Sequence, residues 1–246
     1  MAVNGQPRVV AVVCTYWPNR RTNLVTILDN LLTSSRRPDC TVVLNNNSDR
    51  VYAPGDLSPV PSQVRVINSY NTTCRGKFIA ALFEPADYYL LLDDDTSVGR
   101  TTIETLLAAS HRGICTGYLG CMLSPDGSVH TGGRLWPHDA TVVTPVETFC
   151  GCAMWMAFDS LVRMLQLEER VRLDGEWPHQ GDDILAGLAN RSEIVPLHGE
   201  AKFKDLGYQG QAMCYAEADY YGMRDRFTAR VIQELEAGGR ATCQSW

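Results

Sequence analysis

The stretch YYLLLDDDTSV, Tyr88–Val98, joins an apolar run to three consecutive aspartates. Its first six residues have the length and composition of a buried β-strand, and the aspartates come where that strand would end. Adjacent carboxylates repel one another, and this repulsion is costly beside a buried strand unless a positive group neutralises it. The stretch therefore predicts a strand that carries acidic side chains into a site with a cationic partner.

Similar patterns precede this strand. Apolar runs of strand length cover residues 9–15, 40–45 and 63–69, and residues 23–34 carry Leu and Ile with the spacing of one helix face. A shorter helix is expected over residues 76–83. Short apolar strands that alternate with helices predict an α/β fold, with a mostly parallel sheet flanked by helices on both faces.

The second half of the chain continues with a less regular pattern. We find no repeat, low-complexity segment or linker, so a single domain over residues 1–246 is expected. The strands predicted there cover residues 118–124, 151–158 and 192–198, the last ending at His198, and the predicted helices cover residues 101–109, 160–167, 181–189 and 215–235.

Polar side chains follow three of the predicted strands, at Thr15, at Asn45–Ser48 and at Asp93–Asp95. In open α/β sheets, ligands bind outside the carboxyl ends of the strands. The three groups are therefore expected to lie along one edge and to form a single site.

Composition restricts the class of protein. The chain has 246 residues, of which 45% are hydrophobic and 20% charged, and its net charge is −6, which argues against a dedicated DNA or RNA binder. Its nine cysteines include no pair spaced as CxxC, so we expect reduced, mostly buried thiols and no zinc knuckle or disulfide framework. A signal peptide and an apolar run of about 18 residues are both missing, so a cytoplasmic protein without a transmembrane segment is expected.

The aspartates at 93–95 allow three interpretations. They could form an acidic turn that caps the next helix. They could be the Asp-x-Asp motif of a haloacid-dehalogenase-like phosphatase, with GDDILAG at 181–187 as its later acidic motif, although that family opens on its aspartate strand. They could also hold Mg²⁺ or Mn²⁺ on a nucleotide diphosphate, because these ions prefer carboxylate and phosphate oxygens. A non-catalytic sugar- or nucleotide-binding protein would keep Asp93 and Asp95 but would not need Asp183.

Six motifs, in order over residues 8–200, decide between these interpretations. Together they resemble the inverting glycosyltransferases of the GT-A fold, especially the large family 2 group. The motifs are RVVAVVCTYWPNRRTNLVTILDNLL (8–32), VVLNNNSD (42–49), YYLLLDDDTS (88–97), TFCGCAMWMAF (148–158), HQGDDILAGLANR (179–191) and LHGE (197–200).

The resemblance implies a Rossmann-like GT-A domain, with a nucleotide-binding half over residues 8–98, an acceptor-binding half over 99–212 and a C-terminal helical segment over 213–240. It implies metal-dependent transfer of a sugar, with inversion, from a nucleotide-diphosphate sugar to an acceptor hydroxyl. The catalytic base maps onto Asp183, with Asp182 beside it. The resemblance places Mn²⁺ or Mg²⁺ on Asp93, Asp95 and His198.

The remaining site residues are expected from the resemblance together with the chemistry and position of each side chain. The expected acceptor side includes Trp155, Trp177 and His179, and the acceptor is a glycan, a small molecule or a modified nucleic acid such as hydroxymethylated phage-type DNA. Asn45 stands where the family usually has an aspartate that contacts the nucleobase, so the base is left open. The expected donor-binding residues are Thr15, Tyr16, Arg20, Asn45, Asn46, Arg75, Lys77, Asp93, Asp94 and Gly151.

Overall fold

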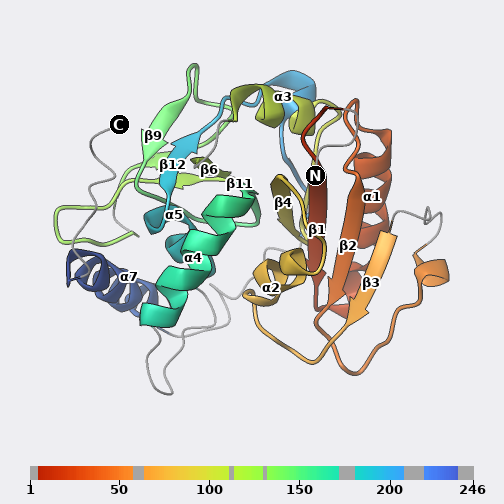
Figure 1. The fold of residues 1–246 in the computed structure, drawn as a ribbon, viewed down its shortest axis with the longest axis horizontal. Helices are drawn as coiled ribbons and strands as arrows, with labels where there is room; N and C mark the ends of the chain where they lie inside the picture. Colours follow the sequence, from red (N-terminus) through yellow and green to blue (C-terminus); the bar gives the residue numbers. More distant parts are fainter. Residues whose placement is uncertain are drawn as a thin grey trace.

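The structure is a computed structural model that describes residues 5–57, 64–110, 114–129, 132–171, 181–207 and 219–237. Its centre is an eight-stranded sheet with the order β3-β2-β1-β4-β11-β6-β12-β9 (Figure 1). These strands are β1 (Val9–Thr15), β2 (Cys40–Asn45), β3 (Val64–Asn68), β4 (Tyr88–Asp93), β6 (Ile114–Gly117), β9 (Thr144–Val146), β11 (Ala153–Ala157) and β12 (Arg191–Ile194).

Six of these strands run in one direction. The first four strands along the chain pair in parallel, and β12 pairs in parallel with β6. Strand β11 is antiparallel to both β4 and β6, and β9 is antiparallel to β12. The predicted α/β fold with a mostly parallel sheet is confirmed, and β1, β2 and β4 have the predicted bounds.

Helices cover both faces of the sheet (Figure 1). Alternate residues of β1 point to opposite faces: Val10 and Val12 pack in one core cluster, while Val9, Ala11 and Val13 pack in the other. Helices α2, α4, α5 and α7 contribute to the first cluster, and α1 and α3 to the second. The helices are α1 (Arg21–Thr33), α2 (Gly76–Leu82), α3 (Thr102–Ala109), α4 (Phe158–Val171), α5 (Asp182–Leu188) and α7 (Tyr220–Ala237).

The second half differs from the prediction at two strands. The strand predicted over 118–124 is replaced by β6 and the two-residue β7 (Gly120–Cys121), which belongs to a separate sheet with β8 (Arg134–Leu135) and β10 (Thr148–Phe149). Gly120 has no side chain, so β7 can pass close to β12 where the chain changes sheets. A Cβ on Gly120 would lie only 2.5 Å from Cγ1 of Ile194.

The strand predicted over 192–198 also ends early. Strand β12 stops at Ile194, two residues before Pro196, which has no N–H for a ladder hydrogen bond. His198 lies beyond the strand and precedes the short 3₁₀ helix η3 (Gly199–Ala201). His198 is therefore not the last residue of a strand, as the sequence predicted, but the residue that precedes η3.

The strand directions bring distant segments to one edge. The carboxyl ends of β1, β4 and β6 lie there, and so does the amino end of the antiparallel strand β11. The backbone N–H of Asp93 donates to the carbonyl of Cys152 at 2.8 Å, which joins the aspartates to the segment before β11. Thr15, Asp93, Tyr118 and Gly151 therefore meet at the same edge, as expected of a ligand site in an α/β sheet.

No helix in the described ranges is both long and apolar enough to cross a membrane. The cysteines in these ranges are free thiols, of which Cys40, Cys115 and Cys121 are buried and Cys14, Cys74, Cys150 and Cys152 are partly exposed.

Candidate active site

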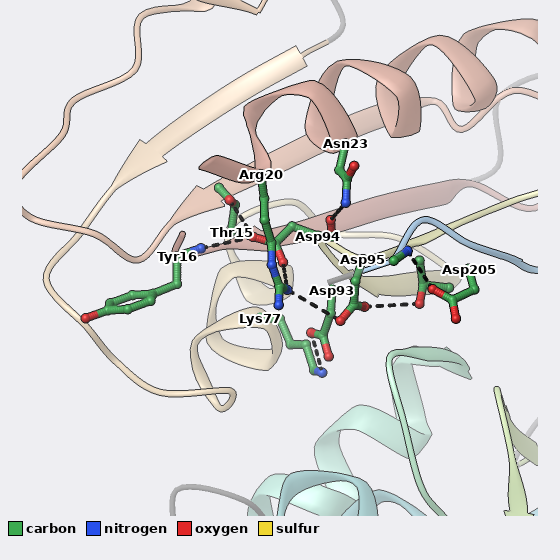
Figure 2. A network of polar contacts seen from close by, with 11 residues as sticks. Thr15, Tyr16, Arg20, Asn23, Lys77, Asp93, Asp94, Asp95 and Asp205 are labelled. Carbon is green, nitrogen blue, oxygen red and sulfur yellow. Dashed lines mark hydrogen bonds and ion pairs between the residues drawn. The ribbon is translucent and has the colours of Figure 1, made fainter. Parts of the chain in front are cut away.

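Asp94, the middle aspartate, is buried and neutralised by an arginine from the chain itself. Arg20 Nη1 lies 2.5 Å from Asp94 Oδ1, and Thr15 Oγ1 donates to Asp94 Oδ2 at 2.8 Å (Figure 2). The side chains of Arg20 and Asp94 are 6% and 5% exposed, so this pair is closed to solvent. Asn23 Nδ2 also donates to the Asp94 carbonyl at 3.1 Å. Asp94 therefore fastens the end of β4 to the loop after β1.

Asp93 and Asp95 flank this interior pair and are less buried than Asp94. Lys77 Nζ lies 2.9 Å from Asp93 Oδ1, and Arg20 Nη1 lies 3.4 Å from Asp95 Oδ2 (Figure 2). The side chains of Asp93 and Asp95 remain 30% and 16% exposed. These two carboxylates can therefore contact a ligand, whereas Asp94 holds the loop.

Lys77 connects the two halves of the site. Its ammonium, on α2, lies 2.9 Å from Asp93 Oδ1 and 3.3 Å from Asp182 Oδ2 at the start of α5. The Lys77 side chain is 2% exposed, although a buried lysine without partners would be very unfavourable. Burial lowers the Lys77 pKa, but Asp93 and Asp182 outweigh burial and raise this pKa well above its usual value.

Negative charge accumulates around Asp93. The pKa of the Asp93 carboxyl is raised to about 7: burial is the largest cause, Lys77 opposes it, and the carboxylates of Asp95 and Asp182 add to the rise. Among the described residues, the ion pairs of Asp93, Asp94, Asp95, Asp182 and Asp183 involve three cations, Arg20, Lys77 and Arg224. Five carboxylates against three cations leave an excess of two negative charges when all are ionised.

Asp183 has a different environment from Asp182. Arg224 Nη2, on α7, lies 2.9 Å from Asp183 Oδ2, and the two side chains are 5% and 7% exposed. The backbone N–H of Gly151 donates to the same oxygen at 3.3 Å, and the N–H of Ile184 donates to Oδ1 at 2.9 Å. Burial raises the pKa of Asp183, while Arg224 opposes that shift. Both oxygens of Asp183 are therefore engaged, whereas Asp182 faces Lys77 and Asp93.

The predicted donor-binding amides have structural contacts. Asn45 is 1% exposed, and its Nδ2 donates to the carbonyl of Arg50 and, at 2.9 Å, to Oδ1 of Asn68. Asn46 is 3% exposed, and its Nδ2 donates to the carbonyl of Thr73 at 2.8 Å. These amides fold the loops beside the sheet edge and do not reach its surface, which corrects the expectation of donor contact.

The other predicted donor residues are divided between the edge and its surroundings. Tyr16 is 40% exposed beside Asp94, and Thr15 is buried beneath it. Lys77 is buried between the carboxylates of Asp93 and Asp182, and its contact with a diphosphate stays a prediction. Arg75 pairs with the buried Glu168 of α4, away from the edge, which differs from the expected diphosphate contact.

The predicted three-ligand metal set does not form. His198 is exposed beyond β12, and no three or more His, Cys, Asp or Glu side chains within the described ranges are arranged to hold a metal ion. Asp93 and Asp95 lie at the end of β4 and are partly exposed, and their role as metal ligands stays a prediction. Two carboxylates suit a Mg²⁺ or Mn²⁺ ion whose remaining ligands are water and substrate phosphate oxygens.

The predicted acceptor residues are also revised. Trp155 is 1% exposed in the core, where its ring stacks on Tyr88 and its indole N–H donates to Ser110 Oγ at 2.6 Å. Trp155 therefore stabilises the sheet and is not an acceptor contact. The other two predicted residues, Trp177 and His179, lie outside the described residues.

Two sets of residues at this edge were not predicted. Arg224 lies 41 residues after its partner Asp183, and nothing in the local sequence separates it from the exposed Arg226 on the same helix. The partly exposed rings of Tyr118, Trp136 and Phe203 come from three segments that only the fold brings together. Tyr118 was predicted as the first residue of a strand over 118–124, so no local signal placed its ring at this edge.

Comparison with known proteins identifies the fold. No protein-family model matches the sequence, and no curated protein is significantly similar to it. The structure of S. aureus TarS 1–349 in complex with UDP-GlcNAc has a TM-score of 0.57 and 12% identity, and the match covers 96% of this chain and 74% of TarS. The mannosyltransferase PcManGT from Pyrobaculum calidifontis, in complex with GDP-Man and Mn²⁺, has a TM-score of 0.51 and 16% identity, and the match covers 96% of this chain and 76% of PcManGT.

Both matches cover 96% of this chain. The haloacid-dehalogenase-like interpretation of Asp93–Asp95 requires the fold of another family and is not retained. The chain has the GT-A glycosyltransferase fold.

Proposed function

We propose that this protein is a metal-dependent, inverting glycosyltransferase that moves a sugar from a nucleotide-diphosphate sugar to an acceptor hydroxyl. The observation that carries the proposal is the grouping of five carboxylates with three cations at the carboxyl edge of a GT-A sheet, which leaves two excess negative charges when all five are ionised. A divalent cation would match this excess. The two structural neighbours, which are complexes with UDP-GlcNAc and with GDP-Man and Mn²⁺, support the same class of donor.

Asp93 and Asp95 would hold the metal ion. Both carboxylates are partly exposed and supply the hard oxygen ligands that Mg²⁺ and Mn²⁺ prefer. When bound, the ion would act as a Lewis acid that stabilises charge on the leaving diphosphate. Arg20 and Asp94 keep the loop after β1 in place beneath the donor, and Tyr16 is the exposed side chain beside it.

Asp182 is the proposed base. An inverting transfer needs one carboxylate to accept the proton of the acceptor hydroxyl as that hydroxyl attacks from the face opposite the leaving group. The family resemblance points to Asp183, but Arg224 and two backbone N–H groups engage both oxygens of that side chain. Asp182 faces the donor half of the site. Its Oδ2 lies 3.3 Å from Lys77 Nζ, and this ion pair orients the carboxylate. Asp183 then acts as a positioning residue for the start of α5 and for Gly151.

Donor binding is tested by thermal denaturation with UDP, GDP, dTDP, CMP and ADP, each with and without Mn²⁺. A nucleotide at 100 times its dissociation constant stabilises the folded chain by about 2.7 kcal/mol, which corresponds to about 5–10 °C for a domain of this size. We expect one diphosphate to give this shift only when the metal is present. No shift with any nucleotide contradicts the proposal.

The base is tested with Asp182→Asn and Asp183→Asn. The substrate is the nucleotide sugar whose nucleotide binds in the thermal assay, and turnover is measured as release of the nucleoside diphosphate. Proton NMR then identifies the anomeric configuration of the sugar product that forms first. Asp182→Asn should lower turnover by about 10²–10⁴-fold and leave the metal-dependent thermal shift unchanged. If Asp182→Asn keeps its turnover and a folded Asp183→Asn loses it, the base is Asp183. A product with the same anomeric configuration as the donor sugar would refute inversion.

A further inference from the structure

A cavity of about 220 Å³ lies near the carboxylates, because its lining residue Asp205 precedes Leu206, whose N–H donates to the carbonyl of Asp95. Its size suits one sugar ring better than a chain of several. The residues that define this aromatic pocket are Tyr118, Trp136, Phe203, His138, Lys202 and Asp205.

Three aromatic rings form the wall of the aromatic pocket. Tyr118 stands at the centre, with its ring centroid 5.3 Å from that of Trp136 and 5.9 Å from that of Phe203. The Trp136 ring is in turn 5.7 Å from the ring of His138. Tyr118, Trp136 and Phe203 are each partly exposed, although side chains of this size are usually buried when they serve only the core. The rings therefore present faces to a ligand.

The aromatic pocket is continuous with the candidate active site. Gly151 has φ +118°, and a Cβ on it would lie 3.1 Å from Cδ1 of Tyr118, while its N–H donates to Asp183. On the other side, the N–H of Leu206 donates to the carbonyl of Asp95 at 2.8 Å, which places the neighbouring Asp205 beside the metal-binding aspartates. Burial, followed by the charges of Asp205, Cys152 and Asp95, raises the pKa of the Tyr118 hydroxyl to about 12.

We propose that the aromatic pocket binds a sugar ring of the acceptor, so that the acceptor is a saccharide or glycoside. This inference rests on the proposed glycosyl transfer and adds the class of acceptor. The negative face of an aromatic ring attracts the polarised C–H groups on one face of a sugar. His138, Lys202 and Asp205 on the rim supply donors and acceptors for its hydroxyls. Pockets with apolar walls and a few polar groups are typical of small-molecule sites.

The charge around the aromatic pocket favours a saccharide over hydroxymethylated DNA as the acceptor. A flipped base could also stack on an aromatic ring, and Lys202 on the rim could contact a phosphate, but Asp205 on the same rim and the nearby Asp95 carry negative charge. Their negative charges repel phosphates, whereas nucleic-acid sites usually carry a basic surface. A neutral sugar avoids this repulsion.

The test uses the full chain, the nucleotide sugar identified by thermal denaturation, and methyl α- and β-glycosides of glucose, galactose, mannose and N-acetylglucosamine. Saturation-transfer NMR measures their binding, and nucleotide release measures transfer. We expect at least one glycoside to bind and to accept the sugar. Trp136→Ala should raise its KM on the order of tenfold or more, with the donor's thermal shift unchanged.

Two further variants keep the test decisive. Phe203→Leu removes a ring but keeps apolar volume, so it reports on the aromatic wall if Trp136→Ala does not fold. Phe83→Ala is the matched control, because this aromatic side chain is 67% exposed at the end of α2, outside the site. An equal KM in both pocket variants and in the control would overturn the inference.

The outcomes distinguish this inference from the proposed function. Intact donor binding with no binding of any glycoside overturns the saccharide acceptor and leaves the glycosyltransferase proposal standing. Transfer to an oligonucleotide that contains 5-hydroxymethylcytosine, and to none of the glycosides, also overturns it. Failure of every nucleotide to bind contradicts the proposed function itself, while glycoside binding by NMR still reports on the aromatic pocket.

Discussion

The buried ion pair between Asp183 and Arg224 connects the start of α5 to the C-terminal helix α7. Replacing Arg224 by Met keeps most of the apolar stem of the side chain and removes its charge. Asp183 then stays 7% exposed with only two backbone donors, and burial already raises its pKa while Arg224 is present. The substitution therefore leaves a buried carboxylate without its cation.

The expected cost follows from this burial. Removing one partner of a buried ion pair destabilises a protein by about 3–5 kcal/mol, because the remaining charge is not compensated. For a domain of this length, each kcal/mol changes the Tm by about 2–4 °C, so Arg224→Met should lower the Tm by about 6–20 °C. Adding Asp183→Asn to Arg224→Met removes the uncompensated charge, so the double variant should be more stable than the sum of the two single changes predicts.

Urea and thermal denaturation of the four proteins in this double-mutant cycle measure the coupling. The matched control is Arg226→Met on the same helix, whose partner Asp219 lies at 2.8 Å, but whose pair is exposed, with side chains 68% and 61% accessible. Solvent screens such a pair, and its contribution to stability is small. Equal losses in Arg224→Met and Arg226→Met, or simple additivity in the cycle, would refute the structural role assigned to the Asp183–Arg224 pair.

Two further predictions concern the edge of the sheet. In metal-free protein, Asp93 has a pKa of about 7 against an ordinary value of 3.8, so its contribution to the free energy of unfolding falls as pH rises from about 4 through 7. Asp93→Asn should therefore be more stable than the wild type at pH 8, by a few kcal/mol at most, but not at pH 4. Urea denaturation in the presence of EDTA measures this difference. A stability difference that does not depend on pH contradicts this cause. Gly151→Ala should lower stability by about 1–3 kcal/mol, because φ +118° is unfavourable for alanine and the new Cβ would press on Tyr118. An unchanged Tm for Gly151→Ala, set against a Gly55→Ala control where a Cβ meets nothing within 4 Å, counts against that strain.

Local sequence was sufficient for the first half of the fold. The apolar runs of β1, β2 and β4 are long and β-branched or leucine-rich, and the structure places these strands at the predicted residues. Their parallel order then brings Thr15 and Asp93–Asp95 to one edge, as the sheet rule required. The second half was predicted less well, because Gly120 and Pro196 change the path of the chain through contacts and missing hydrogen bonds that a local pattern does not contain.

The sequence by itself determined that acidic side chains follow a buried strand, because strand length and hydrophobicity are local properties. Only the tertiary structure decided which cation neutralises each carboxylate: Arg20 for Asp94, Lys77 for Asp93 and Asp182, and Arg224 for Asp183. It also placed Trp155 in the core and Trp136 beside the site. Burial and ion pairing depend on elements far apart in the chain, and the same residue type is buried in one setting and exposed in the other.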